Sequence, residues 1–197
     1  MAFFDSLEEN AGATGDMPSP HSLASKVAAW APSVYTLSIP DNLAPTAAFL
    51  GKIWGGSNEV LRRLWRRPTV LLHSLEGNIQ PTMNFFNRTG YTDLRDDWEL
   101  VPGGQAIVGS YLTASLFNRL LPRWHFVRHL GEAEDEDTVP PTVSVLATAT
   151  DKKFCTAYGT SVVEYETFRT KRAAWFKSSW ESDTWLETGR DMNEQNI

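Results

Sequence analysis

Arginine side chains give the middle of this chain its most distinctive chemistry. Residues 51–130 contain ten lysine and arginine residues, nine of them arginine, and six acidic residues, whereas the whole chain has a net charge of −6. A guanidinium can donate two parallel hydrogen bonds to a phosphate, which the ammonium of lysine cannot do. Because local charge matters more than total charge for binding a polyanion, this stretch is a candidate nucleic-acid-binding region. The candidate contact residues are Arg62, Arg63, Arg66, Arg67, Arg88, Arg119, Arg123 and Arg128.

Four of these arginines lie in one predicted amphipathic helix between Ser57 and Pro68. Ser57 is a typical N-cap residue, and a proline such as Pro68 disfavours helical backbone at the residue before it. Apolar residues and arginines fall on different faces of the helix. The apolar face holds Val60, Leu61, Leu64 and Trp65. The arginine face is interpreted either as a solvated outer surface or as a ridge that faces a polyanion, and both interpretations stay open.

Two more of the candidate arginines flank Pro122, and aromatic residues follow it. Arg119 and Arg123 are four residues apart and are predicted to share a face. Trp124 and Phe126 are expected in the core, with stacking on an exposed base as the alternative.

The histidines and the single cysteine offer little for catalysis. His125 and His129 have the i, i+4 spacing of metal ligands, but the residue after His125 is Phe126 rather than the glutamate of a zinc-protease motif, and no third ligand suggests itself. We therefore expect surface histidines, or histidines beside a phosphate, and no metal. Cys155 has no evident catalytic partner and is expected in the core. The sequence predicts a protein that is not an enzyme and uses no cofactor.

The elements that must position the arginines recur along the chain. A segment that begins at Pro32 returns 36 residues later at Pro68, with Pro, Val, Ser, Asn, Pro, Thr and Phe in register. A third, weaker copy follows 41 residues further on, with Ser115 in the place of Ser74. Repeats of about 30–45 residues indicate a solenoid, in which each unit buries its apolar face on its neighbours. Solenoids are usually binding surfaces.

Each copy is predicted to contain a helix that a proline opens and a glycine ends. Proline suits the first helical turn, where its missing N–H is not needed, and glycine suits the left-handed residue after a helix end. The pairs are Pro45 with Gly55, Pro81 with Gly90, and Pro122 with Gly131.

The remaining segments also favour helices, and strand signals are weak, so we predict an all-α fold. Residues 1–21 are expected to be disordered, residues 22–180 to form one helical-repeat domain, and residues 181–197 to form a loose tail. Loops are expected over 93–104 and, rich in acids, over 132–141. Further helices are expected over 22–30, where Leu23, Val27 and Trp30 have helical spacing, over 110–121, from 150, and over 162–180.

Composition restricts the compartment and the partners. One cysteine excludes a disulfide framework, and the longest apolar runs are far shorter than the ~20 residues of a membrane span, so no membrane is expected. The first ten residues contain acids and no arginine, so no transit peptide or secretory signal is visible. The chain is either cytosolic or lacks its targeting segment here.

Three motifs resemble the mitochondrial transcription termination factor (mTERF) family, and they occur in the family's order. Residues 67–90 resemble its repeat, which reads proline, leucine, S-L-E, isoleucine, proline, then a short helix and a glycine. Residues 110–126 resemble the S-L-x-x-R-L-x-P-R copy near the end of such proteins. Residues 150–154 resemble the S-D-x-x-F that follows it. The resemblance covers roughly residues 25–170, although Pro40 departs from it and the three copies are fewer than usual.

The resemblance implies a curved helical-repeat solenoid with a basic groove. It implies binding of double-stranded DNA or RNA in a mitochondrion or chloroplast. The implied role is control of transcription, including its termination, RNA processing or ribosome assembly. The alternative is a helical-repeat scaffold that binds a protein partner and no nucleic acid, which the charge of −6 and the acidic run at 132–137 favour.

Overall fold

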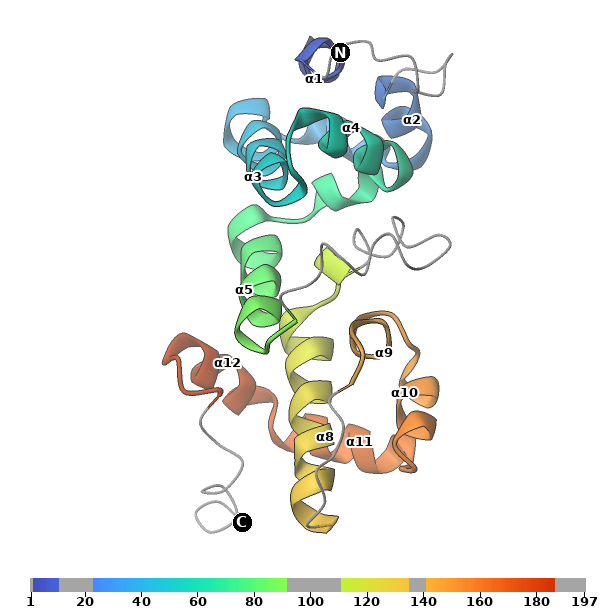
Figure 1. The fold of residues 1–197 in the computed structure, drawn as a ribbon, viewed down its shortest axis with the longest axis vertical. Coiled ribbons are helices and arrows are strands. Elements are labelled where there is room, and N and C mark those ends of the chain that lie inside the picture. The colour runs from blue at the N-terminus through green and yellow to red at the C-terminus, as the bar shows by residue number, and fades with distance from the viewer. Residues whose placement is uncertain (1, 11–22, 92–110, 135–140, 187–197) are drawn as a thin grey trace. The chain divides into compact units, whose positions relative to one another are not determined.

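The computed structural model describes residues 2–10, 23–91, 111–134 and 141–186 (Figure 1). Every regular element in these ranges is helical, so the predicted all-α class is confirmed. The chain forms two compact units, Met1–Thr113 and Ala114–Ile197, and each is described by itself. One continuous repeat domain over residues 22–180 stays a prediction.

In the first unit, α1, α2 and α4 pack against one another, and α3 packs on α4. Two 3-10 turns, η1 and η3, lie side by side, and each precedes a π turn that leads into an α-helix. The elements are α1 (Ala2–Asn10), α2 (Leu23–Trp30), η1 (Pro32–Thr36), η2 (Ile39–Leu43), α3 (Ala44–Trp54), α4 (Ser57–Arg66), η3 (Pro68–Leu72), η4 (Leu75–Ile79) and α5 (Gln80–Arg88).

In the second unit, α8 is the longest helix, and both α11 and α12 pack on it (Figure 1). The short helix α9 packs on the π turn η5 and on α10. The elements are η5 (Leu116–Leu120), α8 (Leu121–Glu134), α9 (Val143–Ala147), α10 (Asp151–Ala157), α11 (Val162–Lys171) and α12 (Ala173–Glu181). None of the helices in the described ranges is long and apolar enough to cross a membrane.

The three sequence copies share one local geometry, which we call the serine–proline module. In each copy a serine hydroxyl accepts a hydrogen bond from the backbone N–H three residues later, and the serine carbonyl accepts another from the N–H five residues later. A proline follows seven residues after the serine, inside the first turn of the α-helix, where its missing N–H is not needed. The serines are Ser38, Ser74 and Ser115, and the prolines are Pro45, Pro81 and Pro122.

Two of the three predicted glycine stops are confirmed. Gly55 and Gly90 follow their helices with φ of 87° and 82°, the left-handed region that glycine adopts readily. The stop predicted at Gly131 is wrong, because α8 continues through Gly131 to Glu134. Helix α8 packs on α11 and α12, and such tertiary packing outweighs the weak local preference of one glycine.

Two predicted helices are divided in the structure. The helix predicted over 110–121 is wrong, because Ser115 starts a serine–proline module and residues 116–120 form a π turn. The helix predicted over 162–180 breaks at Arg172, where φ is −106° and ψ is 6°, into α11 and α12. The break allows both helices to pack on α8.

Both chain ends contribute to the cores. Residues 2–10, predicted to be disordered, form α1, and Phe4 is buried in edge contact with Tyr35. Within the tail predicted to be loose, Trp185 is buried against Trp124. Aromatic residues at the ends are therefore held by burial of their apolar area. Residues 1, 11–21 and 187–197 and the loop predicted over 93–104 lie outside the described residues. Of the acidic loop predicted over 132–141, residues 132–134 belong to α8 instead, and residues 135–140 lie outside the described residues.

Candidate nucleic-acid interface

Helix α4 carries three of the predicted contact arginines, Arg67 directly follows it, and its apolar face holds it in the first unit. Val60, Leu61 and Leu64 are buried, as the amphipathic pattern predicts. The predicted cap at Ser57 is wrong: Gly56, with φ of 115°, is the N-cap residue, and no side chain caps this helix end. One acid in the first turn and arginines in the last turn complement the helix dipole.

Two of the α4 arginines form ion pairs with Glu59, the acid in the first turn of the helix. Glu59 accepts from Arg62 at 2.8 Å and from Arg63 at 3.0 Å. Burial alone raises the pKa of Glu59, but the hydrogen bonds and charges of both guanidiniums bring it below its usual value, so the carboxylate stays ionised at neutral pH. The Arg63 guanidinium also lies over the Trp54 ring, 5.2 Å from its centroid, and the side chain is only 14% exposed. Arg63 is therefore mainly a structural residue.

The other two arginines of this segment lie at the C-terminal end of α4: Arg66 is its last residue and Arg67 its C-cap residue. Arg66 and Arg67 are exposed, and neither forms an ion pair within the part of the chain that the structure describes. Arg62 keeps 43% of its side chain exposed despite its bond to Glu59. These three residues, Arg62, Arg66 and Arg67, form a surface that we call the cationic end of α4.

Arg123 does not belong to a binding surface. Its side chain is fully buried, which contradicts its prediction as a nucleic-acid contact. The guanidinium donates to the carbonyl oxygens of Val145, Leu146 and Ala149 at 2.7–3.0 Å and to Asp151 Oδ1 at 2.7 Å. Carbonyls at the end of a helix lack partners within it. Arg123 supplies those partners at the end of α9.

The other predicted arginines are separated from the cationic end of α4 in sequence and setting. Arg119 shares a face with Arg123, as predicted, but this face is turned to α9, where Arg119 donates to the Ala147 carbonyl at 3.0 Å. Arg128 is exposed and lies 4.6 Å from the centroid of Trp124. Arg88 is exposed at the end of α5. Of the predicted contact residues, exposed arginines are brought together at the end of α4, whereas on α8 Arg128 is exposed and Arg123 is buried.

The prediction of surface histidines is wrong for His125. Its imidazole is buried and packs on the rings of Trp124, Trp175 and Phe176. Burial, followed by the charges of Arg128 and Arg172, lowers its pKa to about 3, so the ring is neutral. His129 stacks on Phe168 instead, with ring centroids 5.4 Å apart. His125 is thus part of an aromatic core, and His129 is half-buried.

Core positions were predicted correctly for three further residues. Phe126 and Trp124 are buried, so neither offers a free face to a base. Cys155 is buried, and burial raises the pKa of its thiol, which disfavours a reactive thiolate.

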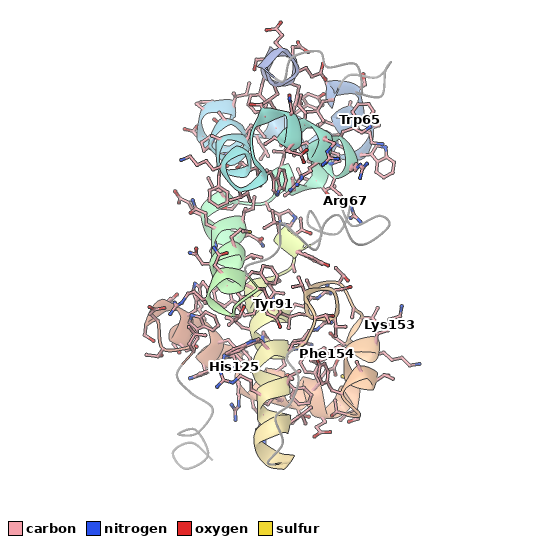
Figure 2. The ribbon with its side chains drawn as sticks, viewed as in Figure 1. Trp65, Arg67, Tyr91, His125, Lys153 and Phe154 are labelled. Atoms are coloured by element: carbon pink, nitrogen blue, oxygen red, sulfur yellow. The ribbon has the colours of Figure 1, made fainter. Side chains whose placement is uncertain are left out.

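Sequence reasoning missed a pair of tryptophans beside the cationic end of α4. Helix α2 packs on α4, and the Lys26 ammonium lies 4.2 Å from the Trp30 ring centroid and 5.7 Å from that of Trp65. Trp30, which has helical spacing with the buried Leu23 and Val27, is 65% exposed. Figure 2 shows Trp65 on α4, with Arg67 just past the end of this helix. The i, i+4 spacing of Lys26 and Trp30 was the available signal.

No protein-family profile, curated protein or solved structure matches this chain.

Proposed function

We propose that this protein binds nucleic acid through the cationic end of α4 and regulates gene expression in a mitochondrion or chloroplast without catalysing a reaction. The observation that carries the proposal is the exposure of Arg62, Arg66 and Arg67 beside a single acid, Glu59. This local excess of cations contrasts with the acidic chain. Phosphate is the ligand that such a surface attracts most strongly.

The recurrence of the serine–proline module supports a repeat protein of the mTERF type. Three copies have the same serine cap and the same bond between residues five apart. In repeat proteins, identical local geometry in successive units allows the units to stack into a curved surface. A curved solenoid with a basic groove is part of the proposal.

The proposed mechanism is phosphate neutralisation. Each arginine that pairs with a phosphate releases a condensed counterion, so the logarithm of the binding constant falls with the logarithm of salt concentration by about 0.7–0.9 per contact. Three arginines would therefore contribute a slope of roughly 2–3. Their guanidiniums are held by a helix whose opposite face is buried.

Fluorescence anisotropy with labelled duplex DNA, duplex RNA and single-stranded RNA tests the proposal. We expect binding that weakens with salt, and a reduced salt slope for the variant R62A/R66A/R67A. The matched control is K152A/K153A/K177A, which removes three exposed cations from the second unit. Equal effects of both variants would show general electrostatic attraction, and salt-independent binding would contradict the mechanism.

A protein-binding scaffold is the second candidate, and exposed apolar residues on the turns of the first unit favour it. Ile39 is 46% exposed and Leu72 is 41% exposed, on η2 and η3 of adjacent copies. Light scattering on wild type and I39D/L72D tests whether these residues support self-association. A monomer in both cases, together with nucleic-acid binding, would disfavour the scaffold.

A further inference from the structure

We propose that Lys26, Trp30 and Trp65 form a stacking platform for unpaired nucleotides, so that the nucleic acid favoured by this surface is single-stranded. This inference rests on the proposed function and specifies its ligand. The platform joins two helices, because α2 supplies Lys26 and Trp30 and α4 supplies Trp65.

The exposure of Trp30 is not explained by the packing of its helix. Leu23, Ala24 and Val27 of α2 are all buried, so the helix is anchored without it. Trp30 is the only tryptophan in the exposed class among the described residues. An indole offers a large apolar area, and a ligand that covers it gains the burial that the fold leaves unused.

The two helices of the platform carry more cations than acids, whereas α1, which packs on both, carries three acids. The Lys26 ammonium lies over both indoles, 4.2 Å from the Trp30 centroid and 5.7 Å from the Trp65 centroid. Arg66 and Arg67 directly follow Trp65 in the chain, and both are exposed. Helix α2 contains no acid, and the one acid of α4, Glu59, is occupied by Arg62 and Arg63. An aromatic face beside unpaired cations therefore suits a ligand with flat rings and negative charges.

Unpaired nucleotides have this combination. Bases stack on aromatic side chains with little dependence on sequence, while the backbone phosphates follow a basic surface. In a duplex the faces of the bases are covered by their neighbours, so only the phosphates would be available to this surface. Lys26, Arg66 and Arg67 would then bind the phosphates of a duplex or a single strand, whereas Trp30 would stack only on the bases of a single strand.

The test compares two substitutions of Trp30 in the full chain. W30L keeps an apolar side chain but removes the aromatic face, and W30F keeps an aromatic face. With a labelled single-stranded RNA of about 12 nucleotides, within the range of known stacking sites, we expect W30L to weaken binding about 5- to 100-fold and W30F to retain most of the affinity. A duplex of the same length should bind both variants like wild type. Thermal unfolding checks that both variants are folded.

The NMR resonances of the indole N–H groups of the tryptophans report directly on binding at Trp30. The resonance missing from W30F identifies Trp30, and we expect it to shift when single-stranded RNA is added and to stay in place with duplex.

Three outcomes would overturn the platform. They are an unchanged affinity in W30L, an equal loss in W30F and W30L, and an equal loss for single strand and duplex. If R62A/R66A/R67A loses binding while W30L does not, the proposed function stands and only the platform is wrong. If wild type binds none of the probes, the proposed function fails and the platform fails with it.

Discussion

The second and third serine–proline modules differ most clearly at the residue that follows the proline. In the second copy this residue is Thr82, and in the third it is Arg123, yet both side chains are fully buried. Thr46 occupies the same position in the first copy and is also buried. The position thus accepts the short side chain of threonine or the long side chain of arginine, and the element packed against it determines which of them can be buried there. In the third copy the neighbour is the end of α9, which presents carbonyl oxygens to the guanidinium.

Acceptors within the fold distinguish structural arginines from arginines that are candidates for binding a ligand. Arg123 has several acceptors in the fold, including Asp151, which lies 2.7 Å from one nitrogen. Arg66 and Arg67 extend from a helix end into solvent and have no carboxylate partner in the described ranges. Charge counting treats these residues alike, whereas their settings give them different roles.

The largest effect expected from this comparison is the loss of Arg123. R123M leaves the carbonyl oxygens at the end of α9 without their donor. Asp151 is 32% exposed and keeps Arg169 at 3.7 Å, so the main cost comes from the carbonyls. A buried acceptor that loses its donor costs about 1–3 kcal/mol. We expect this loss in the free energy of unfolding of the second unit, measured by urea denaturation. Hydrogen exchange should show faster exchange in α8 and unchanged exchange in α4.

R128M is the matched control, because Arg128 lies on the same helix but is exposed. It should cost less than about 1 kcal/mol, the size of an exposed cation–π contact. Similar losses for R123M and R128M would contradict the structural role of Arg123.

The second effect is a pH dependence confined to the second unit. The pKa of His125 is about 3 in the folded state, against 6.5 for an ordinary histidine. Between these values the unfolded chain binds more protons, so the contribution of neutral His125 to stability is complete above pH 6.5 and is lost as the pH falls toward 3. At about 1.4 kcal/mol per pH unit, the loss at pH 5 is about 2 kcal/mol.

H125F should remove most of this dependence, because phenylalanine keeps an aromatic ring among Trp124, Trp175 and Phe176. Urea denaturation at several pH values measures it, with exchange rates assigned to each unit. An unchanged pH profile in H125F would show that another group is responsible.

The smallest effect tests whether the modules are energetically equivalent. S74A and S115A each remove a cap whose hydroxyl accepts from a backbone N–H, at 3.0 Å and 3.2 Å. Loss of such a cap costs about 1 kcal/mol. We expect similar losses in the two units by thermal unfolding. A much larger loss in one of them would show that the equal geometry conceals unequal packing.

The sequence was most informative where structure is local. The helices after Pro45 and Pro81 and their glycine stops were predicted correctly, because proline and glycine act on their own backbone. The stop at Gly131 was wrong because α8 is lengthened by contacts with α11 and α12. The break at Arg172 was missed for the same reason: it depends on tertiary contacts.

The candidate site shows the same limit. The amphipathic pattern located α4. Glu59 lies three and four residues before Arg62 and Arg63, a spacing that allows the ion pairs observed in the structure. The burial of Arg123 could not be predicted, because its acceptors lie 22–28 residues away in the chain. Trp30 has helical spacing with Leu23 and Val27, which are buried, and only the packing of α2 shows that Trp30 is exposed.

The serine–proline module also has a consequence for how such a chain can change in length. The distance from serine to proline is seven residues in all three copies, whereas the copies themselves are 36 and 41 residues apart. One residue added inside the module would rotate the following helix by about 100° and turn its buried face toward solvent. Insertions are therefore expected to be tolerated between modules and rejected within them, which offers a rule for adding or removing copies by design.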